Sequence, residues 1–333
     1  MVRVMFVAHL TIDQKPTATD FAKARELIEI RGTGELSLHD RRVINILYAN
    51  AGVRLCDDVE HVIGVAELRG SHKGSERVSE SITRLQKTLV LVPTVDRKGK
   101  PATKRVPILS ETTTTNDEDD PDGMVVYSFS PGMRAIIKDS TLWGRVRTAV
   151  VFAFTSKYSL ALYELITARI NLKHIWQAEF GVDDLRALLG VPDGKLERIP
   201  NLLQKVIRPA EAEVNGVAEF GVKIEPLRKG GPKRGLVTGF RISWWRKDEP
   251  ALKDAYNELN RSKVGRIARL TGKAVEVKAT GGFPGISDEV GQALRELRAT
   301  AEAETAEKLE RMRAEERAKG SLEIVLPPLP APA

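Results

Sequence analysis

The chain of 333 residues has almost no cysteine, because Cys56 is its only one. A single thiol excludes a disulfide framework and a cysteine-based zinc site, and it is typical of a protein in a reducing compartment. Long apolar runs are also absent, since no stretch approaches the roughly 18 apolar residues of a membrane helix. The short apolar opening, residues 1–10, lacks the cleavage pattern of a signal peptide. These absences predict a cytoplasmic protein without a membrane partner.

The signatures of several enzyme classes are missing as well. No G-x-x-x-x-G-K-[ST] loop is present, which disfavours a helicase or another NTPase of that type. The histidines form no His-x-His or His-x-x-x-His pair, so an origin-nicking enzyme would lack its usual metal ligands. We therefore expect no catalytic residue, no metal and no cofactor. The five histidines are His9, His39, His61, His72 and His174.

Positive charge is in modest excess and is unevenly distributed. Lys and Arg number 52 against 45 Asp and Glu, which gives a net charge of +7. Residues 1–140 carry 20 basic and 20 acidic groups, whereas residues 141–250 carry 18 and 12. The acidic stretch 117–122 would repel a phosphate backbone and is predicted to be a solvated loop. The distribution indicates that nucleic acid, or another acidic partner, meets the third quarter of the chain.

The first half has the order of several helices followed by strands. Ser37 and Asp40 form a capping-box pattern at the start of a helix that ends at Gly52. A basic tip, residues 96–101, joins two predicted strands into a hairpin. The predicted elements are helices over 20–31, 37–52, 59–69, 75–89 and 132–139, and strands over 89–95, 104–109 and 124–129.

The second half repeats this order, and that repetition predicts the fold. Helix, short helix, turn, helix and two strands joined by a basic loop is the order of a winged helix. We therefore predict an α+β chain with tandem winged-helix domains. The elements are helices over 156–170, 184–189 (capped by Asp183) and 200–208, strands over 217–224 and 236–245, and the glycine-rich loop 228–235.

Beyond the second unit the sequence predicts a charged helical extension. Residues 248–270 are basic and helical, residues 287–319 form a charged, alanine-rich helix, and the end is rich in proline. The predicted domains are an N-terminal winged helix at 1–140, a C-terminal winged helix at 141–250, and an extension with its tail at 251–333.

The helix from residue 200 has one apolar and one polar face. At about 100° per residue, Asn201 and Arg208 lie opposite the apolar stripe, with Gln204 and Lys205 on its shoulders. These side-chain types match base edges and phosphates in the major groove, whereas the alternative is an ordinary solvated face. The corresponding helix of the first half has Glu76 and Glu80 in its exposed face, which predicts weaker DNA contact or a role in dimerisation.

The loop between the last two strands is the second candidate for DNA contact. Its cations would neutralise phosphates and supply affinity without sequence preference, whereas the alternative is a solubilising turn. The full set of candidate DNA-binding residues is Arg77, Arg84, Lys87, Arg198, Asn201, Gln204, Lys205, Arg208, Arg228, Lys229, Lys233 and Arg234.

Three motifs in the second half resemble those of one protein family. Residues 156–165, SKYSLALYEL, resemble the S-K-Y-S-x-x-L-Y-E-L helix of iteron-binding plasmid replication initiators. Residues 184–191, DLRALLGV, are similar to their L-R-x-L-L-G-V helix, and residues 205–215 to their K-x-V-I-x-P-A…I-N segment. The motifs occur in the family's order, and residues 36–45 of the first half match more weakly.

The resemblance implies two winged helices of common descent and no catalytic site. The C-terminal unit would be the main reader of repeated origin sequences (iterons) in double-stranded DNA. The N-terminal unit would make dimer contacts in one state and DNA contacts in another. Monomers would help to melt the origin and recruit the host initiator and the replicative helicase, while homodimers would repress their own gene.

Two other functions remain open at this point. A winged-helix transcription regulator without an initiation role would share the fold and the basic loop. An origin-nicking enzyme is disfavoured by the missing histidine pairs.

Overall fold

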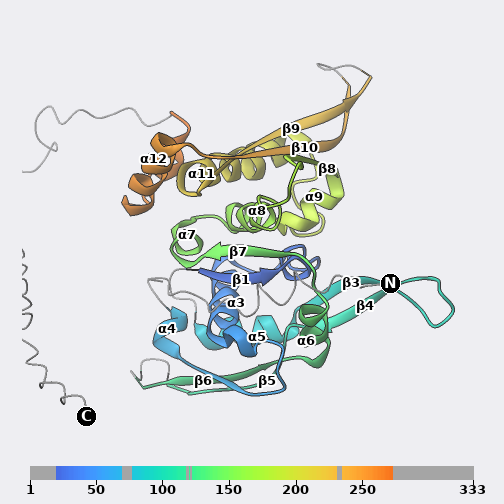
Figure 1. The fold of residues 1–333 in the computed structure, drawn as a ribbon, viewed down its shortest axis with the longest axis vertical. Helices are drawn as coiled ribbons and strands as arrows, with labels where there is room; N and C mark the ends of the chain where they lie inside the picture. Colours follow the sequence, from blue (N-terminus) through green and yellow to red (C-terminus); the bar gives the residue numbers. More distant parts are fainter. Residues whose placement is uncertain (1–19, 70–76, 118–119, 121, 231–234, 273–333) are drawn as a thin grey trace, which may run out of the picture. The chain divides into compact units, whose positions relative to one another are not determined.

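The computed structural model describes residues 20–69, 77–117, 120, 122–230 and 235–272 (Figure 1). The predicted helix at 287–319, the proline-rich tail, and Lys233 and Arg234 lie outside these residues. Among the described helices, none is long and apolar enough to span a membrane.

The first winged helix begins at a capping box, as the sequence predicts. Ser37 Oγ accepts a hydrogen bond from the Asp40 backbone N–H at 3.1 Å, and Asp40 Oδ2 accepts one from the Ser37 N–H at 2.9 Å. The elements of this unit are α3 (Leu38–Ala51), β2 (His61–Gly64), α4 (Val65–Arg69), α5 (Val78–Lys87), β3 (Leu89–Val95), β4 (Pro101–Pro107), β5 (Leu109–Thr114) and β6 (Met124–Phe129).

The strands of this unit form two separate sheets. β2, β6 and β5 make an antiparallel sheet in the order β2-β6-β5, while β3 and β4 pair with each other in a two-stranded ribbon. We call this ribbon, residues 89–107, the arm. The predicted hairpin is therefore present. It is an additional ribbon between α5 and β5, and it does not belong to the three-stranded sheet that carries the wing. The wing of the sheet is the β5–β6 connection, which contains the acidic stretch 117–122; residues 118, 119 and 121 of this predicted loop lie outside the described residues.

The second winged helix has the same order of elements and the same sheet. Its three strands lie in the order β8-β10-β9, which corresponds to β2-β6-β5. Trp244, Phe220 and Phe240 are fully buried between this sheet and the helices. The elements are α8 (Lys157–Thr167), β8 (Gln177–Gly181), α9 (Val182–Leu189), α10 (Ile199–Leu202), a π-helical turn (Leu203–Ile207), α11 (Arg208–Val217), β9 (Phe220–Lys229) and β10 (Leu236–Arg246).

The prediction of a helix over residues 20–31 is wrong. β1 (Asp20–Ala24) pairs antiparallel with β7 (Trp143–Arg147), and only α2 (Arg25–Ile28) is helical. The partner strand lies more than a hundred residues away in the sequence. Pairing with this strand outweighs the helical spacing of the apolar residues in 20–31. α6 (Pro131–Lys138) and α7 (Thr148–Ala153) lie on either side of β7 along the chain.

Other boundaries also differ from the sequence prediction. Residues 59–69 hold β2 and α4 instead of one helix, and α9 begins after Gly181 without a side-chain cap from Asp183. Asp183 lies in the first turn of α9, where a carboxylate still interacts favourably with the helix dipole. The stretch 248–270 is interrupted between α12 (Glu249–Asn260) and α13 (Arg266–Leu270): Arg261 is extended at the end of α12, and Gly265 has a φ of +69° at the start of α13.

Candidate nucleic-acid interface

The helix that follows the turn of the second winged helix has one buried and one exposed side. Leu202, Val206 and Ile207 are at most 1% exposed and pack into the core. Gln204, Lys205 and Arg208 are exposed, as predicted, whereas Asn201 is only half-exposed. The side chains with the best access to a ligand are therefore Gln204, Lys205 and Arg208.

A π-helical turn follows Asn201 in the middle of this helix. The Arg208 N–H bonds the Leu203 carbonyl, five residues back instead of four. Pro209 follows directly, and its ring has no N–H and crowds the carbonyl four residues before it. The helix loosens ahead of Pro209 and then continues to Val217, so the predicted end at residue 208 is wrong. The wider turn changes the faces that a regular 100° rotation assigns.

The C-terminal half of the same helix is fixed to β9 by polar side chains. Asn215 Nδ2 donates to the Val222 carbonyl at 2.8 Å, and its Oδ1 accepts from the Val222 N–H at 2.7 Å. Glu211 Oε2 accepts from the Ile224 N–H at 3.1 Å, and burial raises the pKa of this carboxyl above its usual value. The helix is thus held at one half and leaves its exposed half free for a ligand.

The turn before this helix is held by Arg186 of α9. Its guanidinium donates to the backbone carbonyls of Leu196 and Lys195, which close the loop between the two helices. Arg198 comes next, at the N-cap position of α10, and it is exposed. Arg198 therefore precedes the same helix whose next turns expose Gln204, Lys205 and Arg208.

The wing of the second unit carries its cations at the ends of long strands. Arg228 and Lys229 are exposed at the end of β9. Arg228 Nη1 donates to the Gly235 carbonyl at 2.9 Å, so this side chain also closes the base of the wing. A guanidinium has five N–H donors, so the exposed Arg228 has further donors with which it could bind phosphate.

The corresponding helix of the first winged helix, α5, exposes fewer unpaired cations that could contact DNA. Arg77 and Lys87 are exposed, but Arg84 is bound to Asp40 of α3 through two hydrogen bonds of 2.9 Å. Burial acts to raise the pKa of Asp40, but hydrogen bonds from Arg84 and Ser37 outweigh it and hold that pKa below its usual value. The charge of Arg84 is therefore paired within the domain, and its predicted contact with DNA stays a prediction.

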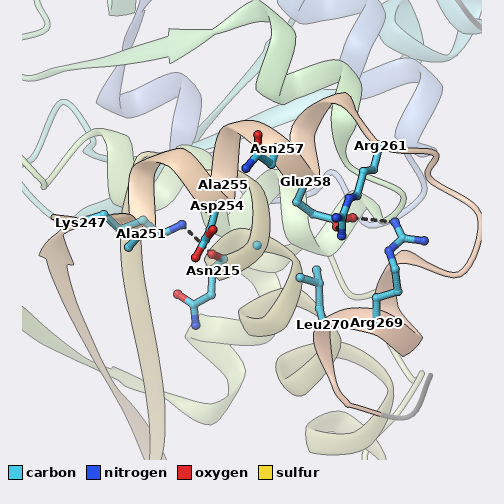
Figure 2. A pocket seen from close by; sticks show the side chains of 11 residues that line it. Asn215, Lys247, Ala251, Asp254, Ala255, Asn257, Glu258, Arg261, Arg269 and Leu270 are labelled. Atoms are coloured by element: carbon cyan, nitrogen blue, oxygen red, sulfur yellow. Dashed lines mark hydrogen bonds and ion pairs between the residues drawn. The ribbon is translucent and has the colours of Figure 1, made fainter. Parts of the chain in front are cut away.

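The basic residues of the extension, 248–270, also largely bind partners within the chain. Arg266 is 1% exposed, with its Nε donating to Glu258 at 3.1 Å and Nη1 donating to the Ala153 carbonyl. Arg269 donates to the same carboxylate at 2.6 Å. Both side chains line a cleft of about 450 Å³ between α11, α12 and α13 (Figure 2). Lys247, at the other end of the cleft, donates to the Asn215 carbonyl at 2.6 Å. These groups fix the extension to the second unit rather than forming a free basic surface.

The described part of the chain holds no group of three His, Cys, Asp or Glu side chains suited to a metal ion. Two of the histidines, His39 and His61, are 3% and 8% exposed within the first unit. His9 and His72 lie outside the described residues.

Comparison with known families covers both winged helices. Residues 20–167 match the family model described as "Initiator Replication protein, WH1", and residues 181–244 match the one described as "Initiator Rep protein, WH2". No curated protein matches the chain. Both matches fall on the units whose sheets and helices repeat one another. The chain belongs to the family of plasmid replication initiators that are built from two winged-helix domains.

Proposed function

We propose that this initiator binds repeated origin sequences in double-stranded DNA mainly through its second winged helix. The observation that carries the proposal is the exposed polar half of the helix at 199–208, beside a wing with exposed Arg228 and Lys229. Arg and Gln are side chains that pair with guanine and adenine in the major groove. Lys205, Arg198 and the wing cations supply phosphate contacts, which fix register without reading sequence.

The proposed mechanism needs no catalytic residue. Binding of several copies to adjacent repeats favours a bent or partly opened duplex, because the protein's contacts offset the cost of deforming the DNA. The opened origin would then be the place where the host initiator and the replicative helicase join. A homodimer, in equilibrium with the monomer, would repress the gene of the protein itself.

The experiment is a replication test of the gene with its adjacent DNA on a plasmid that lacks another origin. Replication that depends on the intact gene supports initiation, whereas binding without replication supports the transcription regulator. Incubation with supercoiled origin DNA and a divalent metal ion completes the test, because the proposal requires that the substrate stays unnicked. The matched control is a chain with Arg208→Ala, which keeps its core and lacks one proposed base-reading side chain.

A further inference from the structure

The arm of the first winged helix is a projecting ribbon whose outer part touches little else (Figure 1). Each strand has seven residues, which at roughly 3.3 Å per residue gives a length of about 20 Å. Val90 and Val106 are 1% and 2% exposed and anchor its base in the core. Residues 94–101, by contrast, are all exposed.

The tip of the arm is a well-defined turn. Asp96 Oδ1 accepts hydrogen bonds from the backbone N–H groups of Lys98 and Lys100, at 2.8 and 2.9 Å. Gly99 has a φ of +76°, a conformation that suits glycine. The one carboxylate of the tip is therefore bound to its own backbone, and the neighbouring cations are left to face solvent.

Positive charge gathers along the arm, with three of its five cations at the tip. Residues 96–105 contain five cations and one acid. None of the five forms an ion pair with a residue that the structure describes, in contrast to Arg84 on α5. The five cations are Arg97, Lys98, Lys100, Lys104 and Arg105.

We propose that the arm is a second DNA-binding element, which contacts the phosphates of duplex DNA through Arg97, Lys98 and Lys100 at its tip. The proposal rests on the proposed function, because it assigns the first winged helix a contact beside the segment bound by the second. A two-stranded ribbon is narrow enough to enter the major groove, whose borders are rows of phosphates. The charge that α5 and the β5–β6 wing do not provide is therefore supplied by the arm.

The residues of the arm favour DNA over the other partners of a charged ribbon. Pro101, Lys104 and Pro107 on β4 are of the types that natural sheet edges use against pairing with another strand, which argues against a second copy of the chain. Near the tip, Val95 is the large apolar side chain that is exposed, at 64%. One such residue does not make the apolar face that a membrane-surface element needs.

The test compares two triple variants of the full chain on one random-sequence duplex of about 40 base pairs. The first variant is Arg97→Ala, Lys98→Ala and Lys100→Ala. The control is Lys138→Ala, Lys173→Ala and Lys253→Ala, three exposed lysines outside the arm and the second unit's helix and wing. We expect the arm variant to bind roughly tenfold to a hundredfold more weakly, and its slope of log affinity against log salt to flatten by up to about 2.7. The control should change both quantities far less.

Failure of DNA binding by the arm and failure of the proposed function would give different results. An arm variant that matches the control in affinity and salt slope overturns the proposal, and the arm then serves another acidic partner. A loss of affinity that coincides with a changed sedimentation coefficient also overturns it, because the arm would then act through self-association. The proposed function fails differently: wild-type protein would then show equal affinity for origin and random duplexes. Thermal midpoints of both variants should stay near wild type, since the replaced side chains are exposed.

Discussion

The two winged helices of this initiator share a topology and differ in where they place charge. The sheet orders β2-β6-β5 and β8-β10-β9 correspond strand for strand. The wing of the first unit, residues 115–123, holds five acidic and no basic residues. The loop of the second wing, residues 228–235, holds four basic and no acidic residues. The wings of the two units therefore carry opposite charge on the same scaffold.

The helices that follow the turns differ in the same sense. α5 has an exposed Glu80, and its Arg84 is paired with Asp40, whose side chain is fully buried. The helix at 199–217 keeps its carboxylates in the half that is fixed to β9, and its other half exposes Gln204, Lys205 and Arg208. The contribution of a winged helix to DNA binding therefore depends on which charges are paired within the domain.

Removing the cations of the second wing should have the strongest effect on DNA binding. Replacing Arg228, Lys229, Lys233 and Arg234 by alanine should weaken binding to origin and random DNA together, because phosphate contacts carry no sequence information. The slope of log affinity against log salt should flatten by up to about 3.6, or about 0.9 for each phosphate that is no longer neutralised. Titration by mobility shift at several salt concentrations measures both, and an unchanged slope means that this wing points away from the backbone.

A weaker and more selective effect is expected from Arg208. Removing one good base contact costs about 1–3 kcal/mol at the cognate site and leaves background binding largely intact. Arg208→Ala should therefore narrow the gap between origin and random DNA more than Asn201→Ala does, because Asn201 is half-buried. A competition assay measures the gap, and a larger effect at Asn201 would show that the π-helical turn does not set which residues read bases.

Arg84→Ala should affect stability instead of DNA affinity. Asp40 loses its main partner, and with Arg84 about a third exposed we expect a loss of about 1–2 kcal/mol at neutral pH. The pKa of Asp40 is lowered in the fold, so its stabilisation is present above the unfolded value of about 4 and is lost as the pH falls through the folded one. Denaturant titrations should show that the difference in free energy of unfolding between wild type and Arg84→Ala becomes smaller below about pH 4. If Arg84→Ala has the stability of wild type but binds DNA more weakly, Arg84 contacts DNA.

Neutralising the acidic wing should change DNA binding least. Asp117→Asn, Asp120→Asn and Asp122→Asn should raise affinity for random DNA by less than about threefold, because this wing does not approach the phosphates in the binding mode that we propose. Asparagine keeps the acceptor that Asp120 offers to the Asp122 N–H. A gain comparable to the loss at the second wing would place the first wing against DNA.

Much of this difference between the two units could be predicted from the sequence. The capping box at Ser37 and Asp40, the hairpin at 96–101 and the exposed Gln204, Lys205 and Arg208 all follow from local spacing. Of the two adjacent tryptophans, Trp244 is buried and Trp245 is 46% exposed, as strand alternation requires.

What could not be predicted depends on contacts that are distant in sequence. β1 pairs with β7, and Arg84 finds Asp40 44 residues earlier, so neither has a local signal. The acidic stretch is visible in the sequence, but its place as the wing depends on β5 pairing with β6 and on the arm being an insertion. The π-helical turn has one sequence signal, Pro209, but its register is set by packing of the helix on the core.

Whether the second winged helix reads bases and the first does not can be tested by one competition measurement on two matched pairs of substitutions. The ratio of affinities for an origin fragment and a random duplex of equal length is measured for Gln204→Ala with Arg208→Ala, and for Arg77→Ala with Lys87→Ala. We predict that this ratio falls at least roughly tenfold for the first pair and stays within about twofold of wild type for the second. A ratio that survives in the first pair and collapses in the second would contradict this assignment.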